Sequence, residues 1–178
     1  MRRTVLLTLL LAVVATASYA DWSEAEEIKE VTRRVEYIYQ HVGKMTEAEM
    51  DKRFCTKQYL KLNKRFQKKC RKQGEVIRDY DHWLMGQEYD KDFRITIDSV
   101  SIPGELKFAI VKLTVHNFED QRVTLQVLYE RGNWFINDFT RHQDNIEPGG
   151  YEDTEIDIMF NYVEGIQMEP EDVKRDEP

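Results

Sequence analysis

The sequence has none of the compact motifs that identify a catalytic or cofactor site on their own. It contains no phosphate-binding glycine loop, no GxSxG nucleophile turn, no paired-cysteine motif and no HExxH zinc motif. His82 has no second histidine or cysteine at the spacing that zinc ligands use. These absences remove the enzyme classes that such motifs define, and the sequence predicts no metal site and no cofactor.

Cysteine is equally scarce, with only Cys55 and Cys70 in the whole chain. In an exported protein, two cysteines favour a disulfide. However, both fall in what we expect to be one helix, where their separation in sequence corresponds to roughly 22 Å. A disulfide needs Cα atoms within about 7 Å of each other. Either the helix breaks between them, or both thiols stay free and buried.

Long apolar runs are missing except at the N-terminus. There an arginine pair precedes an apolar run that starts at Val5, and Ser18 and Ala20 are small residues at the positions that a signal peptidase reads. This pattern predicts a signal peptide over residues 1–20 rather than a membrane span. Asp21 follows, not cysteine, so we do not expect a lipoprotein. We expect the chain to be exported, to the periplasm or the medium, without a transmembrane helix.

The mature chain is long enough for one domain with a hydrophobic core. Cleavage after Ala20 leaves 24 basic and 33 acidic side chains, a formal charge of −9. Such acidity argues against nucleic acid as the main partner. We expect one α+β domain over residues 21–164 and a disordered acidic tail over residues 165–178. The sequence does not predict an oligomeric state.

Alternating apolar residues between 93 and 139 predict four antiparallel strands with one buried face. Residues on that face of the middle two strands are Ala109, Val111, Leu113, Val115, Val123, Leu125, Val127 and Tyr129. An odd-length loop around Glu119 keeps these two sets on one side. In the first strand Ile95 and Ile97 point inward, and a bulge is expected at Ser99–Val100.

For the last strand, Gly132–Asn133 predicts a two-residue turn that pairs Arg131 with Trp134. This register places Trp134, Ile136 and Asp138 on the buried face. An aspartate in an apolar surface has a raised pKa and can act as a general acid or base. Alternatively, it bonds to loop backbone or pairs with an arginine. In the catalytic interpretation Trp83, Gln87 and Trp134 line a ligand pocket with Asp138.

Helical patterns flank the strands. Capping boxes at Ser23 and Thr46 predict the starts of two helices, and a third is expected from about Thr56 to Gln73. A short helix is expected over residues 154–164. The third helix has a strongly basic face, formed by Lys57, Lys61, Lys64, Lys68, Arg71 and Lys72. This face is a solvated outer surface, a surface for an anionic lipid, polyanion or acidic protein, or a contact for the acidic tail.

Two short motifs resemble the nuclear-transport-factor-2-like, or cystatin-like, fold and its small exported bacterial members of unknown function. The matching residues are Trp83, Gln87 and Glu88, then Trp134, Ile136, Asn137, Asp138 and Phe139, with Cys55 and Thr56 as a weaker match. Glu88 and Asn137 stand where the family pattern has aspartate. The resemblance implies a curved sheet wrapped around the first helix, with a pocket at the mouth of the cone. Such folds include isomerases, dehydratases and pure binding modules, so the fold does not choose the function.

Three functional hypotheses follow. The first is an exported, non-enzymatic module that binds a protein partner or a small ligand. The second is an isomerase-like or hydrolase-like enzyme centred on Asp138. The third is adhesion of the basic helix face to an anionic surface.

Overall fold

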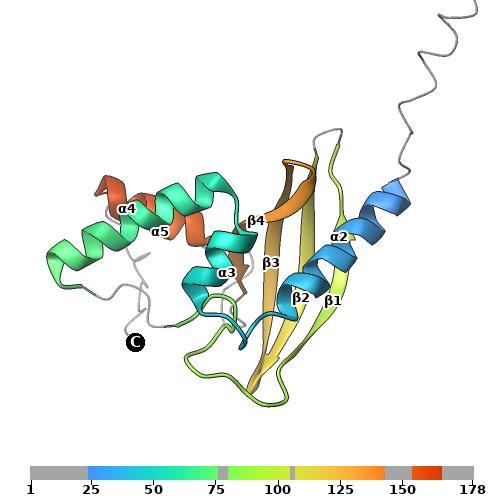
Figure 1. Ribbon diagram of the computed structural model, residues 1–178, viewed down its shortest axis with the longest axis horizontal. Coiled ribbons are helices and arrows are strands. Elements are labelled where there is room, and N and C mark those ends of the chain that lie inside the picture. The colour runs from blue at the N-terminus through green and yellow to red at the C-terminus, as the bar shows by residue number, and fades with distance from the viewer. Residues whose placement is uncertain (1–23, 76–79, 105–106, 143–153, 166–178) are drawn as a thin grey trace, which may run out of the picture.

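The computed structural model describes residues 24–75, 80–104, 107–142 and 154–165 (Figure 1). The signal peptide, the cap at Ser23 and the acidic tail after Gly165 lie outside these residues and stay predictions. Within them the elements, in chain order, are α2 (Glu24–Tyr39), α3 (Glu47–Phe54), α4 (Lys57–Gln73), β1 (Arg94–Ser101), β2 (Phe108–Asn117), β3 (Glu119–Glu130), β4 (Asn133–Arg141) and α5 (Glu155–Glu164). None of the helices in these ranges is long and apolar enough to span a bilayer.

The four strands form one antiparallel sheet in the order β1-β2-β3-β4, so the α+β class with a four-stranded sheet is confirmed. The predicted inner face is also confirmed for the middle strands: their inward residues are at most 1% exposed, except Tyr129, which is half-buried. Only Phe118 separates β2 from β3, which gives the odd-length connection that this parity requires. In β1 the bulge lies between Ile97 and Ser99, next to its predicted position, and turns Val100 inward opposite Val111.

The predicted turn between β3 and β4 is wrong by one residue. Tyr129 pairs with Trp134 and Glu130 with Asn133, so the turn consists of Arg131 and Gly132. Both have positive φ, +51° and +78°, as a type I′ hairpin turn requires. Trp134 still lies on the inner face, because its observed partner Tyr129 and its predicted partner Arg131 are two residues apart and so point to the same side of the sheet.

The face of Asp138 differs from the prediction. A register shift opposite Gln126 and Val127 leaves Asn137 as an extra residue in β4, so strict alternation fails there. Phe139 now pairs with Leu125 on the inner face, and Asp138 pairs with Gln126 on the outer face. Asp138 is nevertheless buried, because α5 covers it from that side.

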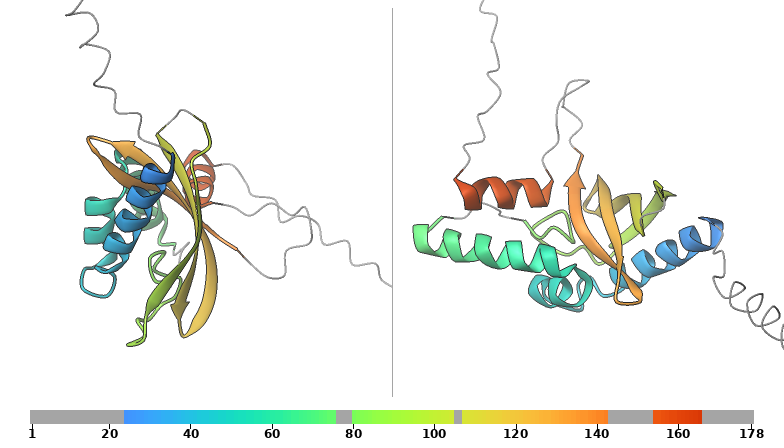
Figure 2. Two further views of the ribbon diagram at one scale, coloured as in Figure 1. Left: turned by 90° about the vertical axis from the view of Figure 1, so that its right-hand side faces the viewer. Right: turned by 90° about the horizontal axis from the view of Figure 1, so that it is seen from above.

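Helices cover both faces of the twisted sheet. In the left view of Figure 2, α2 and α3 lie on one side and α5 on the other. Val31, Val35 and Ile38 of α2 are fully buried, and their spacing of four and three residues places them on one face of the helix. Helices α4 and α5 run side by side beyond β4 (Figure 2). Both cysteines are buried, and they form no disulfide. Cys55 caps the end of α3 and Cys70 lies within α4, so the helix does break between them.

Candidate functional site

The corner between α3 and α4 is fixed to the sheet by one buried threonine. The backbone N–H of Thr56 donates to the carbonyl oxygen of Ile136 at 2.8 Å, and its hydroxyl donates to Oδ1 of Asn137 at 2.9 Å. The same hydroxyl accepts the backbone N–H of Tyr59 at 3.2 Å and so caps α4. Two helices and β4 therefore meet at one side chain, which sets the angle at which α4 leaves α3.

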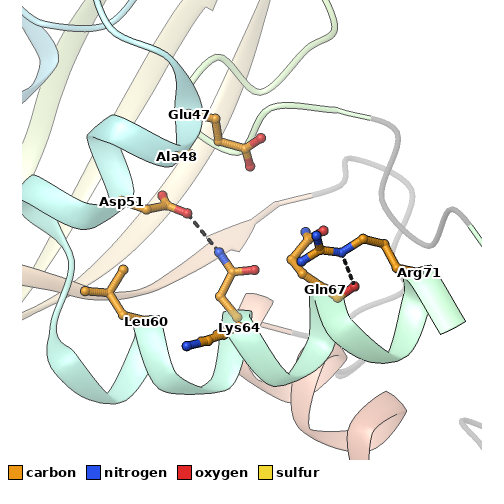
Figure 3. Close-up of a pocket in the computed structure, with 8 residues that line it drawn as sticks. Glu47, Ala48, Asp51, Leu60, Lys64, Gln67 and Arg71 are labelled. Carbon is orange, nitrogen blue, oxygen red and sulfur yellow. Dashed lines mark hydrogen bonds between the residues drawn. The ribbon is translucent and has the colours of Figure 1, made fainter.

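An open groove of about 530 Å³ lies between these helices (Figure 3). It is lined by Glu47, Ala48, Asp51, Leu60, Asn63, Lys64, Gln67 and Arg71. Acidic side chains come from α3 and basic ones from α4, so the two walls carry opposite charge. Asn63 crosses between them by donating from Nδ2 to Oδ2 of Asp51 at 2.9 Å. Its Oδ1 is buried and accepts no hydrogen bond from any described residue.

Asp51 is a buried carboxylate with several donors. Besides Asn63, the indole Nε1–H of Trp83 donates to Oδ1 at 2.9 Å. The Nε2 atom of His82 lies 2.8 Å from the same oxygen. Asp51 is only 4% exposed, so these contacts replace the water that a buried carboxylate loses.

His82 is a fully buried imidazole between two carboxylates. Its Nδ1 lies 2.6 Å from Oε1 of Glu47, and its Nε2 faces Asp51. Glu47 and Asp51 are four residues apart on α3 and therefore project from one helix face. The hydroxyl of Tyr59 lies 3.2 Å from Nε2, and the ring of Phe139 packs edge-on with its centroid 4.6 Å away. These contacts hold the ring in one orientation.

A tight turn presents His82 and Trp83 to α3. The backbone N–H of Asp81 donates to the carbonyl oxygen of Gly86 at 3.0 Å, and Oδ1 of Asp81 accepts the backbone N–H of Trp83 at 2.7 Å. Burial raises the pKa of the Asp81 carboxyl, the hydrogen bond from Trp83 opposes the rise, and the charge of Glu47 adds to it. The turn thus places a third acidic group near the cluster.

Asp138 forms a cap at the start of α5. Its Oδ1 accepts the backbone N–H of Ile156 at 2.9 Å and that of Phe139 at 2.8 Å. Burial raises its pKa to about 6, although these hydrogen bonds and one from Thr154 favour the charged form. These contacts correspond to the non-catalytic alternative for Asp138, in which the aspartate at the end of the strand bonds to backbone N–H groups.

The other residues of the predicted pocket have separate surroundings. Trp83 packs against Tyr39, His82 and Phe139 on the inner face. Trp134 packs against Tyr129 at the hairpin end of β4. Gln87 is exposed. Of the predicted set, Trp83 is the one that reaches the groove cluster, through Asp51.

The predicted basic face of α4 is exposed along its length. Its six residues are all solvent-exposed: Lys57, Lys61, Lys64, Lys68, Arg71 and Lys72. Two further cations of α4 turn towards α5 instead. Arg65 pairs with Glu164 at 2.7 Å, and Nζ of Lys69 donates to the carbonyl oxygen of Tyr162. Glu164 belongs to α5, so this ion pair does not test the predicted contact of the acidic tail, which lies outside the described residues.

Sequence reasoning missed the carboxylate–histidine cluster. The spacing of Glu47 and Asp51 was visible, and it indicates one helix face. No local signal connects that face to His82, which is 31 residues further along the chain than Asp51. A search for pairs of metal-binding residues at short spacing cannot find a set that only the tertiary fold assembles.

In comparison with known proteins, no family model matches the chain, and no curated protein or solved structure is significantly similar to it. The resemblance to the nuclear-transport-factor-2-like fold therefore stays a prediction. A function for the protein has to be inferred from its own side chains.

Proposed function

We propose that this protein is an exported, non-enzymatic binding module, and that its ligand is a small zwitterion held in the α3–α4 groove. The observation that carries the proposal is the groove itself, with walls of opposite charge. Its volume of about 530 Å³ lies within the range of roughly 300–1,000 Å³ that small-molecule sites occupy.

The polar lining favours a ligand with separated charges. On α3, Glu47 offers a carboxylate that is one-third exposed. Oδ1 of Asn63 offers a buried acceptor, and leaving such a group without a donor costs about 1–3 kcal/mol. An ammonium group of the ligand can pair with Glu47, and a small rotation of the Asn63 amide would bring its oxygen to the same donor. On α4, Lys64 and Arg71 are exposed cations that can bind a carboxylate at the other end. Free amino acids and short peptides have this chemistry.

The inner face of the sheet is a weaker candidate for the ligand site. Val31, Val35 and Trp134 are at most 1% exposed, so side chains fill the space between α2 and the sheet in that region. For the enzyme hypothesis, Asp138 has the raised pKa of a general base. Its oxygen is engaged by the backbone of α5, which favours the role of a cap. Both observations support the groove over a pocket at the mouth of a cone.

We also propose the finer fold, a nuclear-transport-factor-2-like cone, for this chain. Its support is the order of helices before a meander sheet, with α2 packed across the inner face next to β1. The predicted signal peptide supports export. Comparison of an experimental structure of this protein with known cone folds tests the fold. N-terminal sequencing of the secreted protein tests export and cleavage of the signal peptide.

The test of the groove is a binding screen with a matched pair of double variants. Calorimetry with free amino acids and di- and tripeptides is expected to find a zwitterion that binds with one-to-one stoichiometry. Lys64→Gln with Arg71→Gln should then weaken binding at least tenfold, because both cations line the groove. Lys57→Gln with Lys72→Gln removes the same charge from the same helix outside the groove, and should leave the affinity unchanged.

Two results would overturn the proposal. One is a panel in which no zwitterion binds. The other is an equal loss of affinity in both double variants, which indicates a general effect of the charge of α4. That second result favours the alternative function, adhesion to an anionic surface, for which the exposure of all six basic residues is the support. Adhesion to an anionic surface predicts that the protein is retained on heparin or anionic vesicles and that this retention falls steeply as the salt concentration rises, which zwitterion binding does not predict.

A further inference from the structure

We propose that His82 and Glu47 bind a divalent transition-metal ion at the inner edge of the groove, with Asp51 orienting the imidazole. The three residues each bring one ligand atom to within 4.8 Å of the others. This inference does not depend on a zwitterionic ligand, because the metal site is formed by the protein alone.

Asp51 holds His82 in the way that metal-binding histidines are usually held. Such a histidine donates the N–H of its second ring nitrogen to a carboxylate, which fixes the tautomer and the ring orientation. Here Nε2 lies 2.8 Å from Oδ1 of Asp51. Trp83 and Asn63 in turn hold the carboxylate, with hydrogen bonds of 2.9 Å each. In a metal-bound form the proton would stay on Nε2, facing Asp51, and the lone pair of Nδ1 would point towards Glu47.

In this tautomer the contact between Nδ1 and Glu47 needs a cation. Nδ1 and Oε1 of Glu47 are 2.6 Å apart, and both are acceptors when the imidazole is neutral. A proton can fill this position, which gives an imidazolium. A divalent metal ion can also occupy this position, because its two positive charges balance the negative charges of the carboxylates of Glu47 and Asp51 around a neutral ring.

A metal ion requires a small movement of Glu47. Tetrahedral Zn²⁺ has bonds of about 2.0–2.2 Å to nitrogen and oxygen, so the two ligand atoms must be about 3.3 Å apart. Glu47 must withdraw by about 0.7 Å from its present position. Its side chain is 34% exposed on the wall of the groove, whereas His82 is fully buried, so Glu47 is the partner that can move.

The donor set selects the class of metal. Imidazole and carboxylate suit Zn²⁺, Co²⁺, Ni²⁺ and Cu²⁺, while Ca²⁺ and Mg²⁺ prefer oxygen ligands alone. The thiol of Cys55 lies 3.9 Å from Oδ1 of Asp51 and contacts the orienting carboxylate rather than the Nδ1 side. With two protein ligands, the ion would have further positions for water or a small ligand, which could approach from the side of Glu47, the ligand that lines the groove.

The experiment is calorimetric titration of the purified, metal-free protein with Zn²⁺ at pH 7.5, together with ¹⁵N spectra of the histidine rings. The expected result is one bound ion per chain and a change of the Nδ1 signal of His82. Glu47→Gln should weaken binding at least tenfold. Glu36→Gln removes the same charge from an exposed position of α2 and should not change it.

The competing site is the exposed pair of His116 and Asp120, whose Nδ1 and Oδ1 atoms are 2.6 Å apart. Zinc binding that survives Glu47→Gln but is lost in His116→Gln would place the metal there and overturn the proposal. So would a His82 ring that stays doubly protonated and unchanged in the presence of Zn²⁺. Because Glu47 is partly exposed, its variant tests the site without removing a buried side chain. A negative zinc result leaves the zwitterion screen unaffected, and a negative screen leaves the zinc titration unaffected.

Discussion

Oδ1 of Asp138, at the end of β4, accepts the backbone N–H of Ile156 at 2.9 Å and so caps α5 from the outer face of the sheet. The contact joins the last helix to the last strand. It also places a carboxylate where burial disfavours its charge and raises its pKa to about 6.

Asp138 makes the stability of the fold depend on pH. Because its pKa is about 6 in the folded state and about 3.9 in the unfolded chain, its stabilising contribution is complete below about pH 4. As the pH rises from about 4 through 6, the protein loses this contribution, which amounts to about 3 kcal/mol of the free energy of unfolding. Asp138→Asn keeps an oxygen acceptor and does not ionise. The free energy of unfolding of the variant, relative to wild type, should therefore rise between pH 4 and pH 8.

Urea denaturation at a series of pH values measures this difference. Asp92→Asn, at an exposed position, serves as the control, and its difference from wild type should stay flat. A flat difference for Asp138→Asn as well would mean that the charged carboxylate is as stable in the fold as in water.

Thr56 should be important for stability despite its small size. Thr56→Val keeps the shape but removes the hydroxyl that caps α4 and bonds to Asn137. We expect a loss of about 2 kcal/mol, since a buried acceptor and a helix cap both lose a partner. Thr96→Val removes an exposed hydroxyl that contacts His116, and should have little effect. Equal effects in the two variants would contradict the role of Thr56 as the anchor of the groove.

The pair of His82 with Asp51 is buried, whereas the pair of His116 with Asp120 lies at the surface, so the two pairs should contribute differently to stability. Asp51→Asn removes the carboxylate that His82 and Trp83 share, and leaving these buried groups with a weaker partner costs about 1–3 kcal/mol. Asp120→Asn breaks the exposed pair with His116 and should cost much less. Chemical denaturation of both variants at pH 7 measures the contrast. Similar losses would show that the carboxylate of Asp51 is replaceable by an amide.

Much of the fold could be predicted because side-chain alternation has a period of two. Val111, Leu113, Val123 and Leu125 have to share a face for any core to form, and that face is the buried one. The bulge in β1 was also indicated, because Val100 breaks the parity of the strand.

Where the prediction failed, the cause was one residue that alternation cannot show. Asn137 is an extra residue in β4, and it turns Asp138 to the outer face. Nothing in the local sequence distinguishes this position from an ordinary polar residue of a strand. The position of the β3–β4 turn is a similar case, because Arg131 adopts a positive φ that sequence rules assign to glycine or asparagine.

The candidate site was the least predictable part. The basic residues of α4 were visible as one face, and so was the spacing of Glu47 and Asp51. What the sequence could not show is that α3 and α4 form the two walls of one groove. Nor could it show that His82 fills the space behind Asp51, since that contact depends on how the turn at Asp81 packs against α3.

The most direct measurement follows the side-chain amide signals of Asn63 and Gln67 by NMR while the zwitterion identified in the screen is added. If the ligand binds between α3 and α4, both signals change and saturate together at one equivalent of ligand, and that of Gln87, which is exposed elsewhere, does not. If the Asn63 and Gln67 signals stay fixed while the ligand binds, the groove is not the binding site.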